Sequence, residues 1–238
     1  MPSETLVLIP PLLCDAGIFS HQVRELSKEH AVMIAPTTRG ERMEEVASQI
    51  LSWAPSRFAL AGAGMGGMVA MEVMRRASER ITRIAMIDTS AQADTPEVAA
   101  GREPQIIAAR SGRFDDVLQH ELNSTWMAPG TDKASLIQLL KDMGHGMGPE
   151  VYVKQARALQ RRKDQQATLR QIKQPAVVLC GRFNGQYPLK RQEFMTEMIP
   201  HGHLEVIEQG GYLSIIESPA SVTDALRRWM KMPLVLRP

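Results

Sequence analysis

LAGAGMGG, residues 60–67, joins two different patterns of hydrophobicity. An apolar, strand-like run at 57–61 leads into this stretch, and a helical pattern at 65–77 follows it. Glycine adopts backbone conformations and close approaches that other residues avoid, so its density here indicates a tight turn. The stretch therefore predicts a strand that turns sharply near Gly64 directly into a helix.

Short apolar runs alternate with helical patterns along most of the chain. The runs lie at 5–9, 31–35, 57–61, 83–88, 176–180 and 203–208, and helical patterns lie at 20–28, 43–53, 65–77, 188–198 and 219–230. Continuous apolar runs separated by helices are typical of parallel strands that are covered on both faces. The sequence therefore predicts an α/β fold with a mostly parallel sheet of about six strands and helices on both faces.

One long segment interrupts this alternation. Between Asp88 and Pro175 there are helical patterns but no strand-like run. The segment is too long for a loop, so it indicates an insertion. We expect residues 91–174 to form a helical lid inserted into a core of residues 1–90 and 175–238. Its expected place is over the carboxyl ends of the strands, where open α/β sheets bind ligands.

Composition excludes several classes of protein. A formal charge of +2 and 5% aromatic residues give no basic, aromatic-interleaved surface, so we expect no nucleic-acid partner. The first residues lack a basic segment, and Pro10 and Pro11 interrupt their apolar run, so we expect a cytoplasmic protein without membrane contact. The two cysteines and six histidines show no metal-ligand spacing. We therefore expect neither a metal nor another cofactor.

Four stretches of the sequence resemble motifs of the α/β-hydrolase superfamily, in particular of its small, esterase-like branch with a helical lid, and they occur along the chain in the same order as in that superfamily. LAGAGMGGMVAMEVM at 60–74 is similar to the G-x-S-x-G turn that carries the nucleophilic serine, together with its helix. PPLLCDAGIFSHQ at 10–22 resembles the oxyanion loop, GRFNGQYP at 181–188 the turn with the triad acid, and EQGGYLSIIESPASV at 208–222 the turn with the triad histidine. The likeness covers nearly the whole chain and implies the α/β-hydrolase fold.

The same resemblance places Gly64, Asn184 and Tyr212 where the superfamily has serine, aspartate and histidine. Glycine has no nucleophilic oxygen, and a phenol with an ordinary pKa of about 10 is a poor base near neutral pH. Asn184 brings no charge, and in a turn we expect it to bond its own backbone. Conventional serine hydrolase activity is therefore not expected.

The oxyanion hole of this superfamily consists of backbone N–H groups, which the resemblance assigns to Met65 and Leu12. Such a hole survives the loss of the serine side chain. We expect Gly64 to enlarge the floor of the pocket. Two interpretations of Tyr212 stay open: its phenol donates a proton to a substrate oxygen, or it only fills the space left by the histidine.

We expect four further residues to bind the ligand, namely Leu13, Trp126, His145 and Tyr187. Glycines flank His145, which predicts that the lid turns there and that the imidazole reaches into the cleft; a solvated turn histidine is the alternative. The lid is also rich in methionine and leucine. These residues favour an apolar or aromatic small molecule with a carbonyl group.

Three functions are compatible with this pattern. The first is a non-hydrolytic enzyme of the isomerase, cyclase, decarboxylase or lyase type that acts on a small carbonyl compound through a backbone oxyanion hole. The second is a pseudoenzyme that binds a small molecule without changing it. The third is an esterase with a relocated nucleophile, for which Cys14 is a candidate. The sequence predicts no particular oligomeric state.

Overall fold

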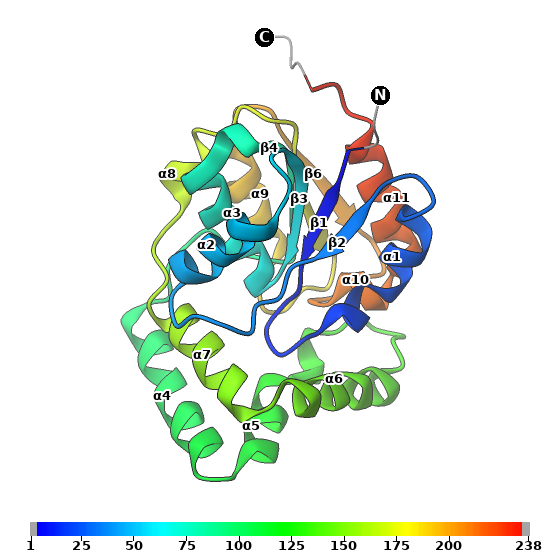
Figure 1. Ribbon diagram of the computed structural model, residues 1–238. Helices are drawn as coiled ribbons and strands as arrows, with labels where there is room; N and C mark the ends of the chain where they lie inside the picture. Colours follow the sequence, from blue (N-terminus) through cyan, green and yellow to red (C-terminus); the bar gives the residue numbers. More distant parts are fainter. Residues whose placement is uncertain (1–3, 235–238) are drawn as a thin grey trace.

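The computed structural model describes residues 4–234, and in this range six parallel strands form one sheet (Figure 1). The strand order is β2-β1-β3-β4-β5-β6, and every neighbouring pair is parallel. The strands are β1 (Leu6–Ile9), β2 (Val32–Ile34), β3 (Phe58–Ala63), β4 (Ile81–Ile87), β5 (Ala176–Gly181) and β6 (Gly202–Ile207). The predicted fold class is confirmed.

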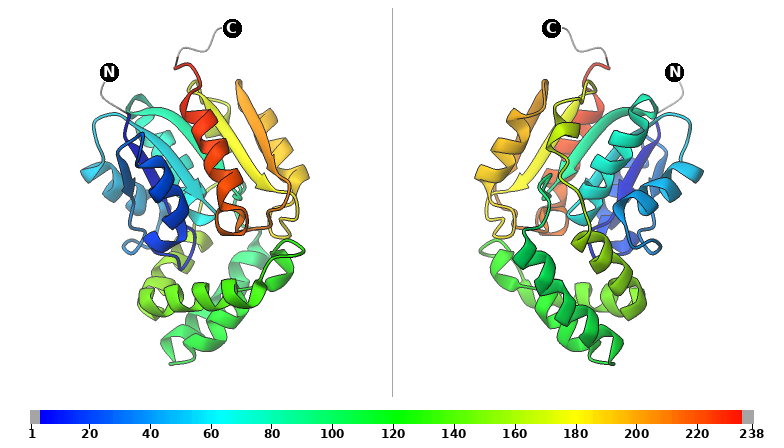
Figure 2. Two further views of the ribbon diagram at one scale, coloured as in Figure 1. Left: turned by 90° about the vertical axis from the view of Figure 1, so that its right-hand side faces the viewer. Right: turned by 90° about the vertical axis from the view of Figure 1, so that its left-hand side faces the viewer.

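Helices cover both faces of this sheet (Figures 1 and 2). One face carries α1 (Ser20–Leu26), α10 (Ser214–Glu217) and α11 (Pro219–Met230), and the other carries α2 (Met43–Trp53), α3 (Met65–Ala77) and α9 (Leu189–Glu197). Side chains of a strand alternate between its faces, so Leu6 and Leu8 of β1 pack in one core and Val7 and Ile9 in the other. Burial on both sides explains the uninterrupted apolar runs.

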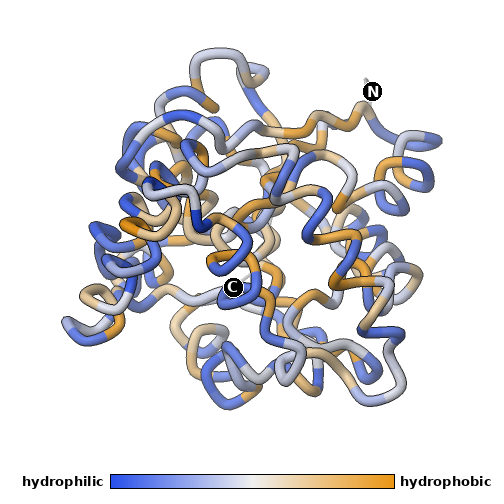
Figure 3. Tube along the Cα trace, turned by 90° about the horizontal axis from the view of Figure 1, so that it is seen from below, coloured by the Kyte–Doolittle hydropathy of each residue, from blue (hydrophilic) through white to orange (hydrophobic). Residues whose placement is uncertain are grey.

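Four longer helices of the inserted segment form a layer at the carboxyl ends of the strands (Figures 1 and 2). They are α4 (Pro96–Arg110), α5 (Phe114–Glu121), α6 (Lys133–Met147) and α7 (Pro149–Gln160), and we call them the lid helices. Figure 3 shows that hydrophobic and hydrophilic residues are interspersed along the chain rather than gathered in separate segments. The remaining elements are η1 (Ala16–Phe19), η2 (Ser78–Arg80), η3 (Ser124–Trp126) and α8 (Gln166–Leu169). Among the helices of residues 4–234, none combines the length and the apolar character needed to cross a lipid bilayer.

The turn between β3 and α3 consists of a single residue, Gly64. β3 ends at Ala63 and α3 begins at Met65, and Gly64 has φ +52° and ψ −119°. Residues with a Cβ rarely adopt this conformation, so the prediction of a sharp turn at a glycine is confirmed. A Cβ on Gly66 would lie only 2.1 Å from the carbonyl oxygen of Ile9, so glycine also lets α3 approach the end of β1. Together these glycines place the amino terminus of α3 beside the loop that follows β1.

A buried ion pair joins the two chain segments that connect the lid helices to the sheet. Asp94 precedes α4 and Arg162 follows α7, and their side chains, each 6% exposed, meet at 2.7 Å between Oδ1 and Nη2. Arg102 of α4 bonds the other oxygen of Asp94 through Nε at 2.8 Å. One carboxylate thus fixes both ends of the inserted segment to each other.

Candidate functional site

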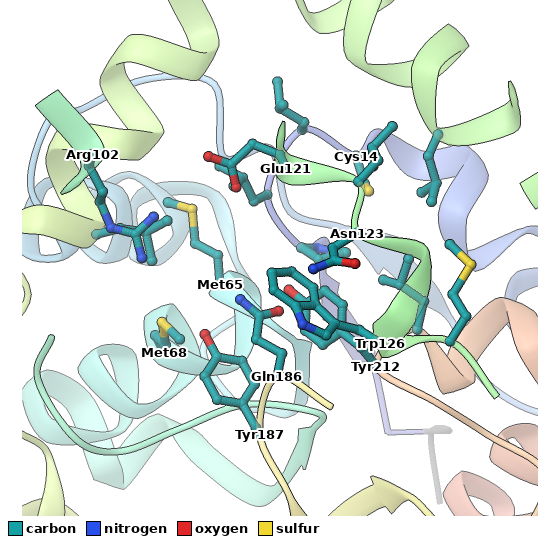
Figure 4. A pocket seen from close by; sticks show the side chains of 18 residues that line it. Cys14, Met65, Met68, Arg102, Glu121, Asn123, Trp126, Gln186, Tyr187 and Tyr212 are labelled. Carbon is teal, nitrogen blue, oxygen red and sulfur yellow. The ribbon is translucent and has the colours of Figure 1, made fainter. Parts of the chain in front are cut away.

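A cavity of about 60 Å³ lies between the lid helices and the carboxyl ends of the strands (Figure 4). Its lining includes residues 11–14, Met65, Met68, Gln186, Tyr187 and Tyr212 from the core, and Arg102, residues 121–123, Trp126 and Leu140 from the inserted segment. A wider hollow of about 440 Å³ shares Arg102, Glu121, Trp126, Gln186 and Tyr187 with it. The shared residues form the boundary between the cavity and the protein surface.

The phenol of Tyr212 lies directly over Gly64. A Cβ on Gly64 would be 2.9 Å from Tyr212 Oη and 3.1 Å from the Cβ of Pro11. These distances leave no free space for a side chain at position 64. The expectation that Gly64 enlarges the floor of the pocket is therefore wrong, because the phenol occupies that volume.

Aromatic neighbours and the backbone fix Tyr212 in this position. Its backbone N–H donates to the carbonyl oxygen of Trp126 at 2.8 Å, and its ring meets the rings of Trp126 and Tyr187 edge to face, each at 5.9 Å between centroids. Within residues 4–234 the hydroxyl makes no hydrogen bond, and it lines the cavity. Burial raises the pKa of this phenol well above its ordinary value. Tyr212 therefore presents a protonated hydroxyl, which is a donor and not a base.

Asn184 is buried in the turn after β5, and both its amide oxygen and its amide nitrogen form hydrogen bonds. Its Oδ1 accepts hydrogen bonds from the N–H groups of Tyr187, at 2.8 Å, and Gln186, at 3.1 Å. The predicted bond between Asn184 and the backbone of its own turn is thus confirmed. Its Nδ2 donates to Oδ1 of Asp88 at 3.0 Å, a contact that the sequence did not predict.

Asp88 follows β4 and is a buried carboxylate that sequence reasoning missed. It has φ +47° and accepts hydrogen bonds from the N–H groups of Gly181 and Ser214, the Ser214 hydroxyl and Asn184. Burial nevertheless raises the pKa of Asp88 to about 7. The sequence does contain a feature that could have identified Asp88, because it is a single acidic residue directly after a central apolar run. In a parallel sheet this position lies at the carboxyl ends of the strands, where ligands bind.

Two backbone N–H groups, those of Met65 and Leu12, belong to residues that line the cavity, as the resemblance implies for an oxyanion hole. Met65 and Leu12 both line the cavity, and neither N–H donates to a protein acceptor in the described part of the chain. The N–H of the adjacent Leu13 is occupied, because it donates to Oε1 of Gln155 at 3.0 Å and thereby ties the loop to α7. Met65 also begins α3, whose amino terminus carries partial positive charge. The arrangement is suited to a negatively charged oxygen.

The inserted segment contributes two charged side chains that the sequence did not single out. Glu121 ends α5, and its Oε1 accepts a hydrogen bond from the hydroxyl of Tyr152 at 2.7 Å. Arg102 of α4 lines the same cavity (Figure 4). Both residues belong to helices that carry several other charged residues, so no motif distinguished them. Only the packing of the lid helices on the core brings them to the cavity.

Of the four residues expected to bind the ligand, Leu13, Trp126 and Tyr187 line the cavity. His145 does not, because α6 continues through the flanking glycines to Met147 and the chain turns only at Gly148. Its half-exposed imidazole has Nε2 3.1 Å from Oδ1 of Asp115 on α5. The expectation that His145 reaches into the cleft is therefore wrong.

Cys14, the candidate relocated nucleophile, does line the cavity. Burial, assisted by the neighbouring charge of Asp15, raises the pKa of the Cys14 thiol far above its ordinary value. Because the thiolate is the reactive form, this cysteine is a weak nucleophile at neutral pH.

Known proteins resemble this chain in sequence and in fold, although no profile of a known protein family matches it. The pimeloyl-[acyl-carrier protein] methyl ester esterase of Photobacterium profundum is 25% identical over 197 residues, which cover 80% of this chain and 77% of that protein. A thermophilic esterase from Thermogutta terrifontis has a TM-score of 0.87 at 24% identity and covers 97% of this chain and 90% of its own. The enol-lactonase of Burkholderia xenovorans has a TM-score of 0.85 at 20% identity, and the match covers 98% of this chain and 93% of the enol-lactonase.

These likenesses extend over the sheet, the glycine turn and the inserted helices alike, because the matched regions span nearly the whole chain. The parallel sheet with the strand order β2-β1-β3-β4-β5-β6 and the cavity at the carboxyl ends of its strands agree with these likenesses. The chain therefore has the α/β-hydrolase fold.

Proposed function

We propose that this protein is a non-hydrolytic enzyme that acts on a small carbonyl compound, in which Gly64, Asn184 and Tyr212 replace the serine, aspartate and histidine of a catalytic triad. One observation carries the proposal: Tyr212 Oη occupies the volume that a side chain at position 64 would need. The site therefore has a hydroxyl donor where a serine hydrolase has its nucleophile. No acyl-enzyme forms on a glycine.

The free N–H groups of Met65 and Leu12 support a reaction in which negative charge develops on oxygen. Removal of a single donor from such a hole typically lowers turnover by 10²–10³-fold, so the hole by itself is a substantial catalytic device. Tyr212 adds a protonated hydroxyl at the same place. Isomerisation, cyclisation, decarboxylation or lyase chemistry uses this stabilisation without a covalent intermediate.

The cavity lining favours a mostly apolar or aromatic ligand with a polar end. Leucine, methionine and aromatic side chains form most of the surface, and Arg102 and Glu121 supply charge on the lid side. Several similar proteins are named esterase or enol-lactonase, and these names refer to carbonyl substrates. A carbonyl group is therefore the functional group that we assign to the ligand.

Two alternatives have specific support. A pseudoenzyme that only binds its ligand is favoured by the rigid packing of Tyr212 between Trp126 and Tyr187. An ester hydrolase is favoured by the names of the relatives. It would need a relocated nucleophile, and the Cys14 thiol is held in its protonated form.

The test is incubation of the purified protein with a library of small carbonyl metabolites, followed by mass spectrometry of bound species and of products. We expect one compound to be converted without hydrolysis. Tyr212→Phe keeps the aromatic packing and removes only the hydroxyl, so conversion should fall by about 100-fold or more. Ligand that raises the melting temperature but emerges unchanged would establish the pseudoenzyme, and turnover of aryl esters abolished by Cys14→Ser would establish the hydrolase.

A further inference from the structure

We propose that Glu121 is the catalytic base of this cavity and removes a proton from the carbon next to the ligand's carbonyl group. The inference rests on the proposed function and specifies its substrate class: a ketone, aldehyde or ester-like carbonyl compound with at least one hydrogen on the neighbouring carbon. Glu121 belongs to the inserted segment and not to the triad positions, so no resemblance assigns it this role.

The placement of Glu121 is the first support. It comes from α5, whereas Met65 and Tyr212 come from the core, and all three residues line the same cavity (Figure 4). The Glu121 side chain is 16% exposed. Its Oε1 is held by the Tyr152 hydroxyl at 2.7 Å, with the exposed His120 Nδ1 4.0 Å away. Its Oε2 has no hydrogen-bond partner among the residues described, and is free for a ligand.

The second support is that the other titratable groups of the cavity cannot act as bases. Burial raises the pKa of the Cys14 thiol and of the Tyr187 and Tyr212 phenols, so all three hold their protons at neutral pH. The guanidinium of Arg102 does not lose its proton in proteins. The carboxylate of Glu121, by contrast, has an oxygen, Oε2, without a hydrogen-bond partner among the described residues. Of the described residues that line the cavity, Glu121 is the one suited to accept a proton.

The positive charge of Arg102 stabilises the Glu121 carboxylate in this mostly apolar cavity. Its Nε is bonded to Asp94, while Nη1 and Nη2 have no acceptor within the described residues. Burial lowers the pKa of Arg102, but the carboxylates of Asp94 and Glu121 outweigh that effect, and the pKa is raised overall. The Arg102 charge is therefore permanent and lines the same cavity as the proposed base.

The reaction step balances without a further reactant. Glu121 Oε2 takes the proton from the carbon next to the carbonyl, and the C–H electron pair becomes the C=C bond of an enolate. The carbonyl π pair moves to the oxygen, where the N–H groups of Met65 and Leu12 and the Tyr212 hydroxyl hold the charge. Return of the proton to the same carbon regenerates the substrate. In a substrate with a C=C bond next to that carbon, return of the proton to the far carbon of the C=C bond moves the double bond and so isomerises the substrate.

The experiment measures this step without knowledge of the natural substrate. The full chain is incubated in D2O with 4-oxopentanoate or 4-oxo-4-phenylbutanoate, and the loss of the α-proton signals is followed by proton NMR. Wild-type protein should exchange these protons faster than buffer does. Glu121→Gln keeps an oxygen for the Tyr152 hydroxyl and should lower the catalysed rate by about 100-fold or more.

Three variants separate a base from a structural carboxylate. Tyr152→Phe keeps the carboxylate and should stay within about tenfold of wild type, because general-base catalysis depends on Glu121 itself. Glu150→Gln removes an exposed glutamate of α7 and should have no effect. Glu121→Ala should be inactive and should regain exchange when formate is added, whereas a fold that needs Glu121 gains nothing from formate.

The outcomes distinguish this inference from the proposed function. Wild-type exchange no faster than buffer, Glu121→Gln exchange equal to wild type, or failure of formate to rescue a folded Glu121→Ala would overturn the role of Glu121. If Glu121→Gln still converts a metabolite found in the library screen at the wild-type rate, the base is refuted and the proposed function stands. If the wild-type protein exchanges α-protons in D2O but converts no compound of the metabolite library, the result supports Glu121 as a base and counts against the proposed function.

Discussion

Tyr212 Oη lies 2.9 Å from the point that a Cβ of residue 64 would occupy, so Gly64 and Tyr212 depend on each other. The absence of a side chain at Gly64 leaves room for the phenol of Tyr212, and the phenol occupies that volume. A serine introduced at position 64 would therefore meet the tyrosine before it meets a substrate.

The first prediction concerns this pair. Gly64→Ala places a Cβ against Tyr212 in a backbone conformation with φ +52°, and we expect it to lower the free energy of unfolding by about 1–3 kcal/mol. Tyr212→His removes the opposing hydroxyl, so the double variant should be less destabilised than the sum of the two single variants, with a coupling of about 0.5–3 kcal/mol. Urea unfolding of the four proteins measures the coupling, and strictly additive effects would show that the two residues are independent.

A second prediction concerns the turn after β5. Asn184→Asp replaces the Nδ2 donor that bonds Asp88 at 3.0 Å with a second carboxylate. Two buried carboxylates at this distance share one proton, so the variant should be destabilised at neutral pH and increasingly so toward pH 8. Asp88→Asn in the same protein restores a donor and should recover most of the loss. An Asn184→Asp protein with wild-type stability at pH 8 would contradict this prediction.

The third prediction is a pH dependence that Asp88 imposes on stability. Burial raises the pKa of Asp88 to about 7, whereas an unfolded aspartate ionises near pH 3.9. Between these values the native state holds a proton that the unfolded state has lost, so this group makes the free energy of unfolding fall as the pH rises from about 4 to about 7. The contribution is at most on the order of 4 kcal/mol.

Asp88→Asn should remove this dependence and flatten the curve of unfolding free energy against pH over that range. Chemical denaturation of both proteins at a series of pH values isolates the difference, since all other titrating groups are shared. Parallel curves for the two proteins would show that Asp88 keeps an ordinary pKa.

The fourth prediction concerns the ion pair at the ends of the inserted segment. Asp94→Asn leaves the guanidinium groups of Arg102 and Arg162 without their carboxylate, and should cost about 3–5 kcal/mol of stability. Amide hydrogen exchange should increase across the lid helices more than in the sheet. The matched control is Asp116→Asn, whose side chain is 69% exposed and which should change the stability by less than about 0.5 kcal/mol. Equal effects of the two substitutions would refute a special role for Asp94.

The sequence by itself determined the sheet, the order of its elements and the turn at Gly64. Apolar runs and helical periodicity depend on residues that are neighbours in the chain, and each of the six predicted strands overlaps an observed one. A glycine at a strand-to-helix junction likewise carries its conformational requirement locally. For Asn184, the bond to its own turn was predictable for the same reason.

Tertiary structure alone decided what the cavity contains. Tyr212 lies over Gly64 and Asn184 bonds Asp88, although the residues of these pairs are 148 and 96 positions apart in the chain. Glu121 comes to the same cavity from α5. No local sequence pattern spans such separations. The prediction for His145 was wrong because its flanking glycines suggested a turn, whereas α6 continues through them to Met147. Helical and strand patterns report how each segment is buried, whereas the chemistry of the site depends on which segments the fold brings together.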